Sequence, residues 1–304
     1  MRNTYRFILF LLFMLINPML AVSSDLLTIF KDLPYSEFGV KANNKVIEKL
    51  TKTISGPALS SSGKSYLTVN HMGFDVLNTR ESINSWIINE FLEFTKFTKK
   101  PILDIGAGYG NISLTALAQG NEVVANDIAG EHLLNIRKFA FNKGLPLDKL
   151  YLNVYSFPND MDFPNNSFDA VMLHRVIHFM TPQQIIEGFA KINKWLTPGG
   201  KVFIVVMSPQ HKQFASWFLP IYEQKWQQGE EWPGVNLSVK EALPDQAYNL
   251  PEVLHVMDDR PLRLALEKLG FYIEKSDFIS MQHFANKSGE RDGKEAVGII
   301  AVKK

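Results

Sequence analysis

From position 101 to the end of the chain, short apolar runs alternate with stretches in which apolar residues recur at helical spacing. The runs predict seven strands, at residues 102–105, 122–126, 150–154, 169–173, 201–207, 271–274 and 295–302. Helices are expected between them at residues 112–119, 132–142 and 183–196, and again after a cap at Asp258 or Asp259. Strands separated by helices predict an α/β fold, with a mostly parallel sheet that carries helices on both faces.

The pattern before position 101 is weaker. Residues 25–75 show no clear period, although residues 45–54 could form a short helix. A stronger helix is expected from Asn78, a favourable N-cap, with Glu81 three positions later to complete a capping box. Its apolar residues fit one buried face: Ile83, Trp86, Ile87, Phe91 and Phe94.

The alternation lapses between residues 208 and 257, a stretch rich in aromatic residues. We interpret this stretch as an insertion between the fifth strand and the last helix. Several of its apolar residues fit one helical face: Phe214, Trp217, Phe218, Ile221 and Tyr222. The insertion could be a lid that forms a pocket for an apolar or aromatic small molecule, or its aromatic residues could simply pack it onto the domain.

The first residues have the layout of an export signal. Arg2 and Arg6 precede an apolar run at residues 7–16, which is shorter than the roughly 20 residues that span a bilayer. Small residues at positions 21 and 23 offer a cleavage site. We therefore expect a signal peptide at residues 1–23, an N-terminal extension at 24–78 and the main domain at 79–304. An uncleaved membrane anchor is the alternative.

Composition and charge limit the kinds of partner that the chain is expected to bind. Of the 304 residues, 46% are hydrophobic and 21% charged, and the formal net charge is +1. These values are ordinary for a globular protein and do not indicate a nucleic-acid partner, and membrane contact is expected only through an uncleaved N-terminal segment. The chain has no cysteine, which excludes disulfides, thiolate metal sites and a cysteine nucleophile; no metal site is expected.

The most informative stretch is residues 102–110 (ILDIGAGYG), which places three glycines on a turn between a strand and a helix. Glycine lets a nucleotide-like ligand approach the backbone closely. The dinucleotide fingerprint G-x-G-x-x-G requires a glycine at position 111, where this chain has Asn111. The observed G-x-G-x-G spacing therefore disfavours a nicotinamide-dependent oxidoreductase.

This spacing, with Asp104 just before it and Asp127 at the end of the second strand, resembles motif I and its acidic partner in class I S-adenosylmethionine-dependent methyltransferases. Further segments resemble that family in the same order: residues 162–169 (DFPNNSFD), 176–179 (VIHF), 196–200 (LTPGG) and 269–271 (LGF). The resemblance covers residues 79–207 well and 258–304 loosely. It implies a three-layer, Rossmann-like methyltransferase fold with a seven-stranded sheet.

The resemblance also implies roles for single residues. Asp104, Gly106, Ala107, Gly108 and Gly110 would surround the methionine part of S-adenosylmethionine, with Asp104 near its amino group. The alternative is that the glycines only satisfy the geometry of a turn and that the aspartate is a helix cap.

At the other end of the cofactor, Asp127 would hold the ribose and Ile128 would lie against the adenine, unless Asp127 is only a helix cap. The family often has an aspartate after the third strand, where this chain has Ser156 and Phe157, which we assign to the adenine end of the site.

His174 would lie near the methyl group and the acceptor, which makes it the first candidate for a general base. His71 is a more distant candidate, and His178 is expected to pack beneath a loop. A base is needed only if the acceptor loses its proton during the transfer.

The resemblance thus implies a methyltransferase that acts on a small-molecule acceptor, which the sequence does not name. A non-catalytic module that binds S-adenosylmethionine or S-adenosylhomocysteine is the alternative from another class, and an oxidoreductase is the weaker one. Since the cofactor is made inside cells, an exported enzyme would work where another cell supplies it.

Overall fold

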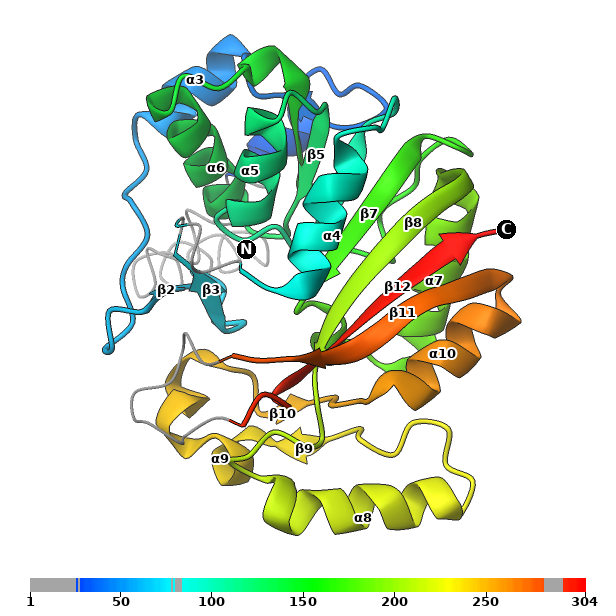
Figure 1. Ribbon diagram of the computed structural model, residues 1–304. Helices are drawn as coiled ribbons and strands as arrows, with labels where there is room; N and C mark the ends of the chain where they lie inside the picture. The colour runs from blue at the N-terminus through cyan, green and yellow to red at the C-terminus, as the bar shows by residue number, and fades with distance from the viewer. Residues whose placement is uncertain (1–25, 27, 78, 80–83, 282–291) are drawn as a thin grey trace, which may run out of the picture.

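A computed structural model describes residues 26, 28–77, 79, 84–281 and 292–304. This part of the chain is organised around one eight-stranded sheet with helices on both faces (Figure 1). In spatial order the strands are β1 (Val40–Lys41), β6 (Leu150–Asn153), β5 (Val123–Asn126), β4 (Ile102–Ile105), β7 (Phe168–His174), β8 (Leu196–Met207), β12 (Ala296–Lys303) and β11 (Phe271–Ile279).

Strand β4 lies in the interior of the sheet and pairs in parallel with β5 and β7, and these continue in parallel to β6 and β8. Strand β12 runs antiparallel to both β8 and β11, so β11 points the same way as the parallel strands. The predicted α/β fold, with a mostly parallel sheet between helices, is confirmed. The two-residue strand β1, which pairs antiparallel with β6, is an addition to the seven predicted strands.

The helices form two layers whose buried residues belong to two separate clusters. On one face lie α4 (Trp86–Thr95), α5 (Asn111–Ala118) and α6 (Gly130–Asn142). On the other lie α7 (Pro182–Trp195) and α10 (Asp259–Lys268). Short 3-10 helices connect the elements at Leu147–Lys149 and Ile177–Phe179.

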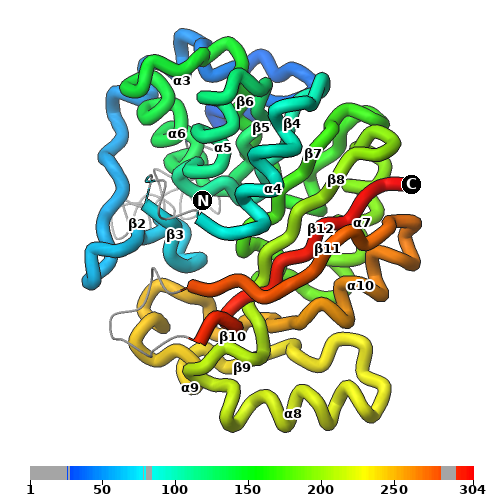
Figure 2. Tube along the Cα trace, in the orientation of Figure 1, coloured from blue at the N-terminus to red at the C-terminus, as the bar shows by residue number. Residues whose placement is uncertain are grey.

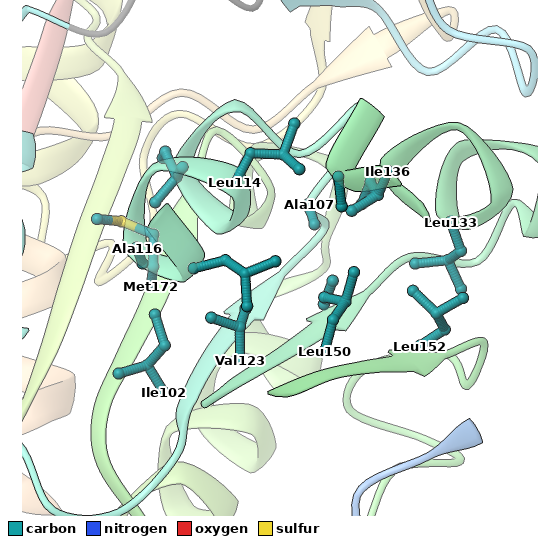
Figure 3. Packing of buried hydrophobic residues seen from close by; sticks show 14 of the residues in the cluster. Ile102, Ala107, Leu114, Ala116, Val123, Leu133, Ile136, Leu150, Leu152 and Met172 are labelled. Carbon is teal, nitrogen blue, oxygen red and sulfur yellow. The ribbon is translucent and has the colours of Figure 1, made fainter. Parts of the chain in front are cut away.

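Every residue of β4, β5 and β6 is buried, because alternate side chains enter the two helical layers. Figure 3 shows Ile102, Val123 and Leu150 of the sheet beside Leu114 of α5 and Ile136 of α6. Each such buried side chain stabilises the fold by about 1.5–3 kcal/mol. The continuous apolar runs of the sequence are therefore the signature of strands covered on both sides.

Some boundaries differ from the sequence-based expectation. Helix α4 begins at Trp86 after Ser85, while Asn78 and Glu81, the expected cap and its partner, lie outside the described residues. Ile87 and Phe91 are fully buried, as predicted for that face.

The fifth and sixth predicted strands are longer than expected. Strand β8 begins at Leu196 and not at position 201. Leu196 pairs with Phe168, and the register then shifts. Strand β11 continues to Ile279 because β12 pairs with it along its whole length.

Residues 208–257 form a separate layer of short elements between β8 and α10, drawn in yellow and gold below the sheet in Figure 1. They contain α8 (Ala215–Gln227), β9 (Leu237–Ser238), α9 (Val239–Ala242), a 3-10 helix (Pro244–Asn249) and β10 (Val253–Leu254). Phe214, Phe218 and Tyr222 are buried in a cluster within this layer. Trp217 and Ile221 are 39% and 44% exposed, so the buried face of α8 is narrower than predicted.

The N-terminal part of the described chain contributes α3 (Lys45–Thr51) and an antiparallel pair, β2 (Ser65–Leu67) and β3 (Phe74–Val76). We call residues 65–76 the hairpin segment; Figure 2 shows it running past the ends of α5 and α6. Among the described residues no helix is long and apolar enough to cross a bilayer. The predicted signal peptide at residues 1–23 lies outside the described residues.

Candidate active site

A cavity of about 250 Å³ lies at the carboxyl ends of β4, β5 and β7. This edge is where open α/β sheets bind ligands, because the loops that leave neighbouring parallel strands diverge there. The cavity, here called the main cavity, is also lined by residues of the hairpin segment and by Ser156, Phe157, His174, Arg175, Val176, Phe179, Met180 and Gln184. The described residues of 208–257 do not line it, so the insertion contributes no wall to this cavity.

The glycine loop has the backbone that only glycine adopts without strain. Gly106, Gly108 and Gly110 have φ values of 66°, 54° and 79°, in the left-handed region. A Cβ atom at Gly106 would lie 2.3 Å from a methyl group of Val176, and one at Gly108 would lie 2.4 Å from the Asp75 carboxylate. Both glycines line the main cavity. The loop is thus shaped for close approach of a ligand to the main chain.

Three of the predicted residues lie behind this surface. Asp104 is 2% exposed and accepts a hydrogen bond of 2.6 Å from the Ser113 hydroxyl at the start of α5. Asp104, Ala107 and Gly110 are not among the residues that line the main cavity. Gly110 instead makes room for Ile136, whose side chain would lie 2.7 Å from a Cβ atom there. The role of Asp104 beside an amino group therefore stays a prediction.

Asp127 lines the cavity and organises the loop. Its Oδ2 accepts a hydrogen bond from the Gly108 amide (2.9 Å), and its Oδ1 accepts one from the Ala129 amide (2.9 Å). His132 Nδ1 lies 3.0 Å from the same Oδ1. A carboxylate offers about four acceptor positions, so Oδ2 retains capacity for a ligand hydroxyl.

His132 connects Asp127 to the hairpin segment. Its Nε2 accepts a hydrogen bond from the Val69 amide at 3.2 Å, so in the neutral ring the proton is on Nδ1 and is donated to Asp127. Burial alone would lower the pKa of His132, but the carboxylates of Asp127 and Asp75 outweigh it and raise the pKa. Protonation of Nε2 would remove the acceptor that holds Val69.

Ile128, Ser156 and Phe157 all line the main cavity, and their place at the adenine end stays a prediction. Ile128 is 50% exposed although it is apolar, which leaves its side chain available to a flat ring. Phe157 packs against Gly188 of α7, where a Cβ atom would lie 2.4 Å from its ring. The absence of a side chain at Gly188 thus lets the Phe157 ring pack directly against helix α7.

Of His71, His174 and His178, only His174 lines the main cavity. It is the last residue of β7 and is half-buried. His71 is hydrogen-bonded to Asn249 through Nδ1 at 2.8 Å and does not line the cavity. His178 is 3% exposed, and burial holds its pKa well below the usual range, in agreement with the expected packing role.

Asp75 is a functional candidate that the sequence analysis missed. It lies on β3, and its Oδ2 accepts a hydrogen bond of 2.5 Å from the Tyr109 amide in the glycine loop. Tyr109 also donates its hydroxyl proton to the Leu67 carbonyl at 2.9 Å. The hairpin segment therefore covers the glycine loop and adds a carboxylate to the cavity. A lone aspartate in a stretch without period gives no sequence signal for this role.

Three carboxylates thus surround the glycine loop: Asp75, Asp104 and Asp127. Burial raises the pKa of Asp75 to about 6 and that of Asp104 to about 7, and the neighbouring carboxylates contribute to both shifts. Such a group of carboxylates favours a ligand that carries positive charge. Among the described residues, no three His, Asp or Glu side chains are arranged to hold a metal ion.

Comparisons with known proteins show which proteins this chain is similar to. Residues 102–200 match the family model for the methyltransferase domain. A ubiquinone biosynthesis O-methyltransferase of Idiomarina loihiensis is 30% identical over 123 residues, which are 40% of this chain and 47% of that protein. A protein of the same name from Pectobacterium atrosepticum is 24% identical over 54% of this chain and 62% of its own length. The chain thus spans about half the length of the curated relatives it matches.

Among solved structures, a S-adenosylmethionine-dependent methyltransferase from Methanosarcina mazei aligns with 70% of this chain and 96% of its own, with a TM-score of 0.53 and 19% identity. This likeness supports the fold. The domain match over residues 102–200 includes the glycine loop at the carboxyl end of β4, so this part of the chain is similar to a methyltransferase domain.

Proposed function

We propose that this chain transfers the methyl group of S-adenosylmethionine to a small-molecule acceptor. The observation that carries the proposal is the main cavity itself, in which a glycine loop without side chains faces a group of carboxylates. The cofactor carries a sulfonium and an ammonium group, so this electrostatic environment suits it.

The residues that line the main cavity can be assigned to the parts of the cofactor. Gly106, Gly108 and Asp75 would hold the methionine part, with the Asp75 carboxylate as acceptor for the ammonium group. Asp127 would accept hydrogen bonds from the ribose hydroxyls, and Ile128 would lie against the adenine, beside Ser156 and Phe157. These assignments follow the predicted residues, with Asp75 added and Asp104 placed behind the loop.

When bound, the sulfonium supplies a methyl group that is already activated for in-line displacement. The protein must mainly align the acceptor with it and exclude water. His174, at the end of β7, would take the proton of a hydroxyl or amine acceptor. The hairpin segment excludes water from the glycine loop through its bonds to Tyr109 and His132.

The acceptor side of the cavity is apolar, with Met72, Phe74, Val176, Phe179 and Met180 in its wall. The volume of the main cavity, about 250 Å³, is close to the lower end of the roughly 300–1,000 Å³ of small-molecule sites, which favours a small acceptor. The relatives named for ubiquinone biosynthesis also point to O-methylation of a small molecule.

The test is calorimetric titration of the full chain with S-adenosylhomocysteine, followed by transfer of labelled methyl from S-adenosylmethionine to a panel of phenols, catechols and amines. We expect a dissociation constant on the order of micromolar and labelling of at least one acceptor class. A folded chain that does not bind the product overturns the proposal. Tight binding without transfer to any acceptor favours a non-catalytic binding module instead.

Cofactor binding should depend on pH. As the pH falls, Asp75, with a pKa of about 6, and Asp104, with a pKa of about 7, take up protons, and His132, whose pKa is also raised, gains a positive charge. All three changes disfavour the ammonium group that S-adenosylmethionine and S-adenosylhomocysteine share, so affinity should increase from pH 5 to pH 8, by at most about tenfold per pH unit for each group. Calorimetric titrations with S-adenosylhomocysteine at each pH measure the slope.

Asp75→Asn is the matched variant for this prediction, because asparagine can still accept the hydrogen bond from Tyr109. It should bind more weakly at pH 8 and lose part of the pH dependence. An affinity that stays constant from pH 5 to pH 8 in the unaltered chain would contradict the proposed role of the carboxylates.

For localisation we propose export, on the evidence of the sequence pattern at residues 1–23. A fusion of residues 1–30 to a reporter that is active only outside the cytoplasm tests this. An active fusion is expected, and an inactive one overturns export.

A further inference from the structure

A second cavity, of about 170 Å³, adjoins the main cavity. Phe74 and Arg175 line both cavities, so these two side chains form the partition between them. The second cavity is bounded by the turn at residues 60–65 and by residues 211–213 and 243–248 of the insertion. We call it the polar cavity.

The wall of the polar cavity favours an anion. Among the lining residues that the structure describes, Arg175 and Lys64 carry positive charge and Asp245 carries negative charge. Arg175 is half-buried at the partition, whereas Lys64 and Asp245 are exposed at the mouth. The remaining polar lining consists of hydroxyl, amide and imidazole groups of Ser60, Ser61, Ser62, Ser65, His211, Gln213, Gln246 and Tyr248.

His211 adds a buried polar group to this wall, since it is only 3% exposed. Its Nδ1 accepts a hydrogen bond from the Gln213 amide at 3.3 Å, and its ring stacks on Phe214 at 5.1 Å. In the neutral ring the proton is therefore on Nε2, so the imidazole presents a donor there. The insertion thus builds part of the polar cavity, although it contributes no wall to the main one.

Arg175 has an unusual backbone for its residue type. Its φ is +63°, in the left-handed region, which costs an arginine about 1–2 kcal/mol. Its amide donates to the Val205 carbonyl at 2.8 Å, and this bond fixes the residue at the end of β7, directly after His174. Strained residues cluster at functional sites, where the surrounding structure holds them in place.

We infer that the methyl acceptor carries an oxyanion, a carboxylate or a phosphate, which Arg175 binds at the partition while the nucleophile lies in the main cavity beside His174. The guanidinium matches the geometry of both oxyanions with two parallel hydrogen bonds. Anchoring one end of the acceptor in the polar cavity orients the other end toward the methyl group. The inference rests on the proposed function, because it names the acceptor of the same site.

The experiment is a titration of the full chain, saturated with S-adenosylhomocysteine, with benzoate, phenyl phosphate and benzyl alcohol. These probes share a ring and differ in the attached group. At least one oxyanion should bind tenfold or more tightly than benzyl alcohol, and the preferred one identifies the acceptor group. Arg175→Gln should lose this preference while its affinity for S-adenosylhomocysteine and benzyl alcohol stays within about twofold.

Three further variants make the result specific. Arg175→Lys should keep part of the preference, because lysine keeps the positive charge. It should not keep all of it, because lysine cannot form the two parallel hydrogen bonds of a guanidinium. Lys64→Gln, at the mouth, should weaken oxyanion binding by about two- to threefold, and it tests the polar cavity even if the Arg175 variants do not fold. Arg263→Gln is the matched control, because Arg263 contacts Asp259 and Ser276 and lines neither cavity.

The outcomes separate the two proposals. If S-adenosylhomocysteine itself does not bind, the proposed function fails. If it binds and no oxyanion is preferred over benzyl alcohol, or the preference survives in both Arg175→Gln and Lys64→Gln, the inference about the acceptor is overturned and the proposed function stands.

Discussion

Replacing Gly106 by alanine is expected to reduce the affinity for S-adenosylhomocysteine by at least about 100-fold, equivalent to about 2.7 kcal/mol. The new Cβ atom would lie 2.3 Å from Cγ2 of Val176, and a β-branched side chain has little freedom to turn away. Val176 follows His174 and Arg175 in the wall of the main cavity, so its displacement disturbs both the cofactor loop and the acceptor side.

Gly144→Ala is a close control for this prediction. Gly144 has the same φ of 66°, but a Cβ atom there would have no neighbour within 4 Å. Both variants should lose about 1–2 kcal/mol of unfolding free energy from the left-handed backbone. Only the Gly106 variant should lose binding, measured by calorimetry at a temperature where both are folded. Equal binding by the two variants would mean that the glycine loop does not form the cofactor site.

Asp127→Ala is expected to remove cofactor binding and also to destabilise the fold. Loss of charge-assisted hydrogen bonds to two ribose hydroxyls costs roughly 1.5–3 kcal/mol each, or more than 100-fold in affinity together. The Gly108 and Ala129 amides and the His132 ring would also lose their acceptor. Each buried group left without a partner costs about 1–3 kcal/mol, so the unfolding free energy should decrease by about 3 kcal/mol or more.

Asp169→Ala separates these two effects. Asp169 also accepts from two main-chain amides and one side chain, those of Lys99, Lys100 and Thr197, but it does not line the main cavity. Denaturant unfolding should show a loss of stability in both variants, and S-adenosylhomocysteine titration should show a loss of affinity only in Asp127→Ala. If the two variants bind equally well, Asp127 is only a structural cap.

The sequence predicts the sheet well because the strands are buried on both faces. Their runs, such as residues 102–105 and 123–126, are mostly apolar, with Asp104 and Asn126 as the polar members, and each is followed by a glycine or a polar residue, so their limits are visible without a structure. The edge strand β1 has only two residues and one buried side chain, so its pattern carries no period. Its pairing with β6 depends on tertiary context alone.

The candidate site is predictable only where a motif marks it. The glycines and Asp127 belong to a recognisable spacing, and they do lie around one cavity, apart from Gly110 behind the loop. Asp75 and Arg175 carry no such mark, because their roles arise when distant segments meet. Asp75 reaches the Tyr109 amide across 34 positions of sequence, and only the fold brings them together.

Tertiary context also decides how many residues of helix α8 in the insertion are buried. Spacing places Trp217 and Ile221 beside Phe214, Phe218 and Tyr222, but it cannot show how wide a surface covers the helix. The buried cluster of the insertion includes Phe214, Phe218 and Tyr222, whereas Trp217 and Ile221 are exposed.

The hairpin segment is attached to the domain through main-chain atoms as well as through the side chains of His71 and Asp75. The Leu67 carbonyl, the Val69 amide and the Gly73 carbonyl make bonds to Tyr109, His132 and Asn249, and none of these depends on the side chains at 67, 69 or 73. Met72 and Phe74, on the same segment, face the acceptor side of the main cavity. Under the proposed function, Met72 and Phe74 can therefore change, and with them the range of acceptors, while these main-chain bonds stay in place.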